Sequence, residues 1–212
     1  MWRKRLKNQT IFYGVRIFLA FINAIPRTTA LSVCDTLGRL ACFCAAGTRR
    51  RTIDNLNRAY GAERTATEIH SMAVQVFREI GRNAVDAIRL SQITPETVSS
   101  LVTVEGMENL ELAYAEGNGV LAVSGHMGNF ELLGAYLAMK GFRLTVVAAA
   151  LYDERLDALL GANRFRGGLN VVQRAHATSE VLRALRRGEV VGLLVDQDTR
   201  VPGTFVRFLD HP

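Results

Sequence analysis

The 212-residue chain is predicted to be an α/β protein with a mostly parallel β-sheet flanked by helices. From residue 99 onward, short apolar runs alternate with segments of helical periodicity, and no internal repeat interrupts this alternation. Apolar strands that alternate with helices of about ten residues are typical of βαβ units. Strands that are covered on both faces are continuous apolar runs, which is the pattern found here.

The expected elements can be assigned in chain order. Thr65 and Glu68 have capping-box spacing, and the apolar residues behind them recur at helical intervals. Thr94-Pro95 ends that helix or starts the next connection, whereas Gly117 and Gly141 follow the ends of two later helices. Helices are predicted over 69–88, 107–115, 130–139, 153–160 and 179–186, and strands over 101–104, 120–123, 144–150, 171–172, 190–195 and 205–208.

The N-terminal part has a different composition. A basic cluster with one tryptophan, residues 2–7, leads into an apolar run, 11–25, and a second apolar stretch covers 30–46. A membrane-spanning helix needs about 20 apolar residues, and the first run is shorter and contains charged and polar residues. The run also lacks a good signal-peptide cleavage site.

We therefore predict two parts of the chain. Residues 1–48 are expected to form helices that lie in, or shallowly cross, a membrane interface, with their basic residues toward anionic lipid. A buried helix pair on the globular core is the alternative for this segment. Residues 49–212 are expected to form the α/β domain, truncated at its C-terminus.

Composition limits the classes of partner. The net charge of +6 and the pI near 9.6 favour anionic partners, such as nucleic acid, acidic lipid or a phosphorylated substrate or carrier. The basic residues are scattered and are not interleaved with stacking aromatics, so no nucleic-acid partner is predicted. Cys34, Cys42 and Cys44 are odd in number and lack metal-site spacing, which favours reduced thiols and weakly favours the cytoplasm.

One turn carries the strongest chemical signal. His126 follows the apolar run 120–124, at the carboxyl end of a predicted strand, where open α/β sheets bind their ligands. An imidazole accepts a proton near neutral pH, and Glu131 lies close enough in the sequence to orient it. Gly128 and Asn129 allow a tight turn, and the helix amides behind them are suited to stabilise an oxyanion. A histidine that only caps the helix is the alternative.

Two further clusters bear charged groups. Arg164 and Arg166 lie beside glycines, and guanidinium groups match the geometry of phosphate, although two solvated surface arginines would give the same pattern. Asp196 and Asp198 follow the strand 190–195 at the expected ligand-binding edge. No His or Cys has spacing to complete a metal site with them, so we predict a polar wall of the site or a cap, and no metal.

Four motifs taken together resemble a known family. Residues 124–131 read S-G-H-M-G-N-F-E, and N-R-F-R-G, L-V-D-Q-D and G-T-F-V-R-F begin at residues 163, 194 and 203. In order and spacing they are similar to the late acyltransferases of lipid A biosynthesis, a group that includes phosphatidylinositol mannoside acyltransferases and has the glycerolphosphate-acyltransferase-like fold. The family usually continues with Pro-Phe-Phe-Gly where residues 207–210 are Arg-Phe-Leu-Asp, and relatives are expected to run on for about a hundred residues.

The resemblance implies a function and a set of residues. His126 would be the general base on a hydroxyl of a lipid A precursor, and Glu131 its charge and orientation partner. The acyl donor would be an acyl carrier protein thioester, with no other cofactor, and the acceptor a membrane glycolipid at the cytoplasmic face of the bacterial inner membrane. The predicted substrate-binding residues are Gly128, Asn129, Arg164, Arg166, Asp196 and Asp198.

Two alternatives remain open from the sequence. The acceptor is another glycolipid or a glycerolphosphate, or the chain is a catalytically inactive relative that binds membranes or a carrier protein.

Overall fold

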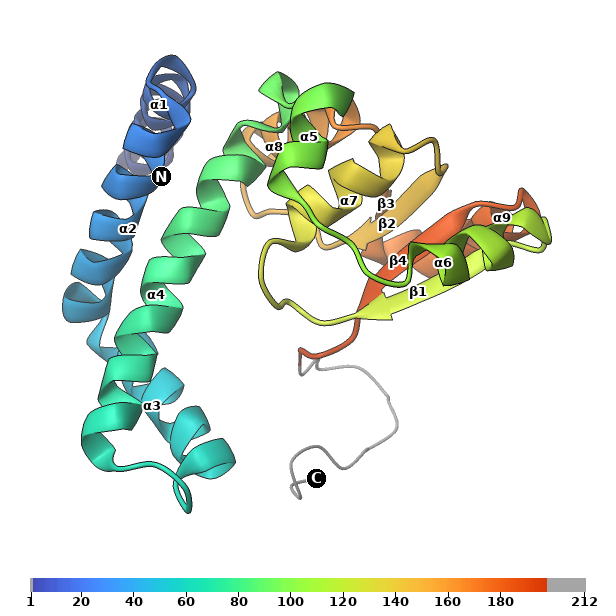
Figure 1. Cartoon of the computed structure of the whole chain (residues 1–212). Coiled ribbons are helices and arrows are strands. Elements are labelled where there is room, and N and C mark those ends of the chain that lie inside the picture. Colours follow the sequence, from blue (N-terminus) through green and yellow to red (C-terminus); the bar gives the residue numbers. More distant parts are fainter. Residues whose placement is uncertain (1, 198–212) are drawn as a thin grey trace. The chain divides into compact units, whose positions relative to one another are not determined.

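The computed structural model describes residues 2–197 (Figure 1). Contacts divide the chain into two compact units, and each is described by itself. The first unit includes residues 1–26 and 86–196, and the second includes residues 27–85.

A four-stranded parallel sheet forms the centre of the first unit. Its strand order is β1-β4-β2-β3, and all three pairings are parallel. This confirms the prediction of an α/β fold with a parallel sheet flanked by helices. The strands are β1 (Val120–Ser124), β2 (Leu144–Ala148), β3 (Leu169–Gln173) and β4 (Val190–Leu194).

Helices and two short 3₁₀ turns surround this sheet (Figure 1). They are η1 (Leu90–Gln92), α5 (Pro95–Leu101), α6 (Met107–Ala115), α7 (Phe130–Met139), α8 (Glu154–Arg166), η2 (Arg174–His176) and α9 (Ala177–Arg186). Ala135 of α7 is fully buried and joins Leu90, Phe142, Leu144 and other buried residues in one apolar core. The core therefore fixes α7, which carries the predicted site at its start, against the sheet.

The predicted strand over 101–104 is wrong. The chain there completes α5 and continues as an irregular segment. Thr94 caps α5: its Oγ1 accepts a bond from the amide of Thr97 at 3.3 Å. Val102 and Val104 pack beside the buried Leu132, so their apolar character reflects burial against a helix instead of pairing in a sheet. The predicted strand 205–208 lies outside the described residues.

A helix, α1 (Trp2–Ala24), also belongs to the first unit. Nη1 of Arg89 donates to the carbonyl oxygens of Ile22 and Ile25 at 2.7 and 2.8 Å, so a cation caps the C-terminal end of the helix. The guanidinium of Arg155 lies 4.3 Å from the ring centroid of Phe12. An apolar stripe remains exposed on the other side of α1 and consists of Trp2, Leu6, Tyr13, Ile17 and Phe21.

The second unit contains α2 (Arg27–Cys44), α3 (Ala46–Tyr60) and most of α4 (Ala66–Ile88), whose last residues belong to the first unit. Helices α2 and α4 approach each other at two glycines. A methyl group on Gly38 would overlap the carbonyl oxygen of Phe77, and one on Gly81 would overlap that of Cys34. Asp35 accepts three hydrogen bonds of 3.0–3.1 Å from Arg78 beside this contact.

Within residues 2–197, no single helix has both the length and the apolar composition needed to cross a membrane. Helices α2 and α3 meet these criteria only as a pair, and the chain bends by 92° between them.

Candidate active site

The parallel pairing of β1 with β4 brings two motif residues together. Ser124 and Leu194, the last residues of the two strands, are aligned, and the amide of Val195 donates to the carbonyl oxygen of Ser124 at 3.1 Å. His126 and Asp196 each lie two residues beyond these strand ends. The same offset on two neighbouring strands therefore places an imidazole beside a carboxylate.

His126 and Asp196 are joined by two contacts. Nδ1 of His126 lies 2.7 Å from Oδ1 of Asp196, and the backbone amide of His126 donates to Oδ2 at 2.8 Å. The side-chain contact, followed by the backbone bond, lowers the pKa of Asp196, so the carboxylate is ionised at neutral pH. A carboxylate only accepts hydrogen bonds, so Nδ1 carries the hydrogen and Nε2 of the neutral ring is left as an acceptor.

The carboxylate of Asp196 packs closely against Gly125, where a side chain would crowd it. A Cβ atom on Gly125 would lie 3.2 Å from Oδ2 of Asp196, which is closer than a relaxed contact. Gly128, on the other side of His126, has a φ of 56°, which L-residues with larger side chains rarely adopt. The turn around His126 therefore depends on both glycines.

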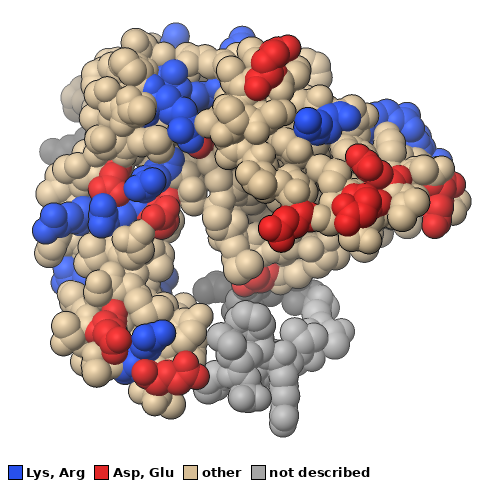
Figure 2. Space-filling model, in the orientation of Figure 1, with Lys and Arg blue, Asp and Glu red and all other residues tan. Residues whose placement is uncertain are grey.

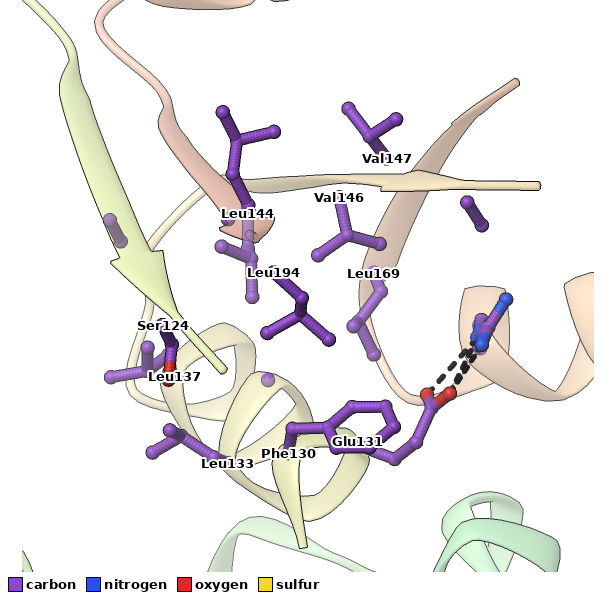
Figure 3. A pocket seen from close by; sticks show the side chains of 16 residues that line it. Ser124, Phe130, Glu131, Leu133, Leu137, Leu144, Val146, Val147, Leu169 and Leu194 are labelled. Atoms are coloured by element: carbon purple, nitrogen blue, oxygen red, sulfur yellow. Dashed lines mark hydrogen bonds and ion pairs between the residues drawn. The ribbon is translucent and has the colours of Figure 1, made fainter. Parts of the chain in front are cut away.

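Glu131 lies in the first turn of α7 and binds an arginine. Both oxygens of its carboxylate accept from Nε of Arg164 at 3.0 Å, and Oε1 also accepts from Nη2. The two side chains are only 13% and 17% exposed, so this pair is partly desolvated. Figure 3 shows Glu131 with these bonds at one side of a pocket.

The last turn of α4 supports both segments that carry these residues. The side-chain amide of Asn129, which caps α7, donates to the buried carboxylate of Asp86 at 3.5 Å. The side chain of Asn163, on α8, donates to the carbonyl oxygen of Ala87. Adjacent residues of α4 thus hold both the start of α7 and the C-terminal part of α8.

An apolar cavity of about 130 Å³ lies between α7 and the sheet. Aliphatic side chains from α7, β2, β3 and β4 point into it in Figure 3, among them Leu133, Leu144, Val146 and Leu194. Ser124, Glu131 and Arg164 contribute its few polar groups. Phe130 also lines the cavity, and its ring packs edge-to-face on His126 with centroids 5.1 Å apart. The imidazole therefore contacts the wall of an apolar compartment through Phe130, although it does not line the compartment itself.

No group of three His, Cys, Asp or Glu side chains within residues 2–197 is arranged to hold a metal ion. The described part of the site contains an imidazole, carboxylates and apolar side chains.

A family model described as "Bacterial lipid A biosynthesis acyltransferase" matches residues 2–212. The chain belongs to this family. The match confirms the resemblance carried by the four sequence motifs.

Two curated relatives of this chain are phosphatidylinositol mannoside acyltransferases of Mycobacterium tuberculosis. The protein of strain ATCC 25618 / H37Rv is 26% identical to this chain over 197 residues, and that of strain CDC 1551 / Oshkosh is 25% identical over 197 residues. The match covers 90% of this chain and 61% of each relative. The chain therefore spans about three-fifths of the length of these relatives.

The structure shows which partners the predicted site residues have, and some of these differ from the expected ones. Glu131 was expected to orient His126, whereas the carboxylate that contacts this imidazole is that of Asp196. Arg164 was expected to contact an anion, and its guanidinium is occupied by Glu131. Only the strand order brings Asp196 to His126, and no local sequence signal states that order.

The structure also shows where most of the remaining predicted site residues lie. Gly128 and Asn129 form the turn and the cap at the start of α7. Arg166 is exposed at the end of α8, and no hydrogen bond or ion pair joins its side chain to another described residue. Asp198 lies outside the described residues. Phe130 and the aliphatic lining were not predicted as site residues, because apolar residues of α7 read equally well as core.

The two carboxylates are predicted to differ in their effect on stability. Glu131→Gln leaves the guanidinium of Arg164 partly buried without its counter-charge, so we expect the free energy of unfolding to fall by about 3 kcal/mol. Asp196→Asn acts on an exposed pair and should leave it nearly unchanged. Urea denaturation followed by circular dichroism measures both. Equal losses in the two variants would contradict the assignment of Glu131 to a structural ion pair.

Proposed function

We propose that this chain provides the catalytic centre of an acyltransferase that moves a fatty acyl chain from a thioester to a hydroxyl of a membrane glycolipid. One observation carries the proposal: His126 has Nε2 available as a base and stands beside an apolar cavity. A hydroxyl needs a base, and an acyl chain needs an apolar compartment. The family match supports the reaction class.

The chemistry follows from the tautomer of His126. Nε2 takes the proton of the acceptor hydroxyl, and the oxygen of that hydroxyl attacks the carbonyl carbon of the thioester. The resulting imidazolium is stabilised by the carboxylate of Asp196, in the orienting role that sequence analysis gave to Glu131. Backbone amides at the start of α7, beside Gly128, are proposed to stabilise the developing oxyanion. Collapse of the tetrahedral intermediate breaks the carbon–sulfur bond, and the leaving thiolate takes the proton from Nε2, which restores the neutral base.

The apolar cavity is proposed to hold the acyl chain. Its lining comes mainly from Leu, Val, Ala and Phe side chains, which offer no partner to a sugar or phosphate. The Glu131–Arg164 pair lies at its wall and keeps α7 and α8 in place around it. In this proposal Arg164 positions the wall while its charge is held by Glu131.

The substrates are assigned by analogy. An acyl carrier protein thioester is the proposed donor, with no further cofactor, and a lipid A precursor is the proposed acceptor, in keeping with the family description. The relatives' names favour phosphatidylinositol mannosides as the alternative acceptor. The parallel sheet is compatible with the glycerolphosphate-acyltransferase-like fold expected from the motifs.

A location at an anionic membrane surface, the cytoplasmic face of the inner membrane, is part of the proposal. The exposed apolar stripe of α1 starts within the basic N-terminal cluster and continues beyond it, a combination that suits an interfacial helix. Acidic side chains gather instead over α6 and the segment before it (Figure 2), namely Glu105, Glu108, Glu111 and Glu116. That face is expected to point away from anionic lipid.

Loss of the base tests the proposed function. His126→Ala should lower acyl transfer by about 10²–10⁴-fold, since proton removal then falls to water. The assay follows transfer from acyl carrier protein to glycolipid by mass spectrometry. His70→Ala, which removes an exposed imidazole from α4, is the matched control and should retain full activity. Near-normal turnover in His126→Ala would refute the mechanism.

The cavity is predicted to set acyl chain length. Gly134 lies on the α7 wall, and a Cβ atom there would come within 2.8 Å of Cδ2 of Leu169. Gly134→Ala should therefore shift preference toward shorter chains, by about fourfold in relative kcat/KM for each methylene that no longer fits. Competition between acyl donors of different length measures this ratio. An unchanged ratio would show that the chain binds elsewhere.

A further inference from the structure

A second hollow lies along α8, and it shares a wall with the apolar cavity. It is a groove of about 350 Å³ between α8 and the edge strand β3. Arg164, Ala148 and Leu169 border both spaces. A ligand in this groove would therefore lie next to the compartment proposed for the acyl chain. We call it the α8 groove.

One face of α8 is open along this groove. Ala158, Gly161 and Ala162 contribute only small side chains to its lining. A Cβ atom on Gly161 would meet nothing within 4 Å, so the space above it is free in the described structure. The groove is therefore wide enough at its middle to take a group that lies against the helix.

The polar groups of the α8 groove are fixed in place. Oδ2 of Asp157 accepts from the side-chain amide of Gln173 at 3.2 Å, and Oδ1 accepts from the amide of Leu151 at 2.9 Å. These bonds leave further lone pairs on the carboxylate, and they leave the carbonyl oxygen and one N–H of Gln173 for a ligand. The groove thus presents oriented acceptors on Asp157 and Gln173, while the donors of Arg164 and Asn170 are partly engaged by Glu131 and Thr145.

This chemistry selects among ligand classes. Phosphate is disfavoured, because Asp157 is anionic and the guanidinium of Arg164 is already held by Glu131. An alkyl chain would leave the oriented oxygens without partners. A polyol supplies hydroxyl donors for them, and its C–H face can cover the alanines and the ring of Phe165, which lines the groove and is 77% exposed.

We propose that the α8 groove, centred on Asp157, Gly161 and Gln173, binds the saccharide headgroup of the acceptor. This rests on the proposed acyltransferase function only in naming the sugar as part of the acceptor. The headgroup would lie on one side of Arg164 and the acyl chain on the other.

Saccharide binding is tested directly, without turnover. The probes are methyl glycosides of mannose, glucose and glucosamine at millimolar concentration, observed by saturation-transfer NMR with the full chain. We expect binding to wild type, and binding about tenfold weaker in Gly161→Leu, which fills the groove. Gly47→Leu is the matched control: its site in α3 is equally open, and it should bind as wild type does. Gln173→Ala should also weaken binding, without adding bulk.

The outcomes separate this inference from the proposed function. No saturation transfer in wild type, or equal signals in Gly161→Leu and wild type, overturns the groove assignment. If wild type transfers acyl chains and Gly161→Leu has an unchanged KM for the glycolipid, the groove assignment fails while the function stands. If wild type binds glycosides and Gly161→Leu does not, the groove stands even where no transfer is found.

Discussion

The site depends on one constraint, the parallel register of β1 and β4. Alignment of Ser124 with Leu194 places His126 and Asp196 at equal distances beyond two neighbouring strand ends. A shift of this register by one residue would move the carboxylate away from the imidazole and turn the strand's side chains to the opposite face. The apolar cores around α7 and the sheet hold this register, so packing far from the reacting groups determines their geometry.

Asp196 and Glu131 lie near the same turn but are proposed to have different roles, because their surroundings differ. Asp196 is partly solvated and contacts the imidazole, and this contact lowers the pKa of the carboxyl group. Glu131 is largely desolvated and paired with Arg164, where its charge is needed to balance a partly buried cation. We therefore propose that the more exposed His126–Asp196 pair acts in catalysis, and that the less exposed Arg164–Glu131 pair supports the cavity wall.

The sequence predicted much of this fold and part of its site. Helices 107–115 and 130–139 match their predicted bounds, since glycines and caps mark their ends. Helix α8 runs to Arg166 past Gly161, because a helix tolerates a single internal glycine. His126 and Asp196 were both predicted as site residues, but their contact follows from strand order, which depends on pairing of distant segments and has no local signal.

We infer that Asp196 holds the hydrogen of His126 on Nδ1 and leaves Nε2 as the base. The ring nitrogens of ¹⁵N-labelled protein, observed by NMR at neutral pH, report this tautomer directly. We expect that His126 carries its hydrogen on Nδ1 in wild type and loses this preference in Asp196→Asn. A ring with its hydrogen on Nε2, or a tautomer that Asp196→Asn does not change, would contradict it.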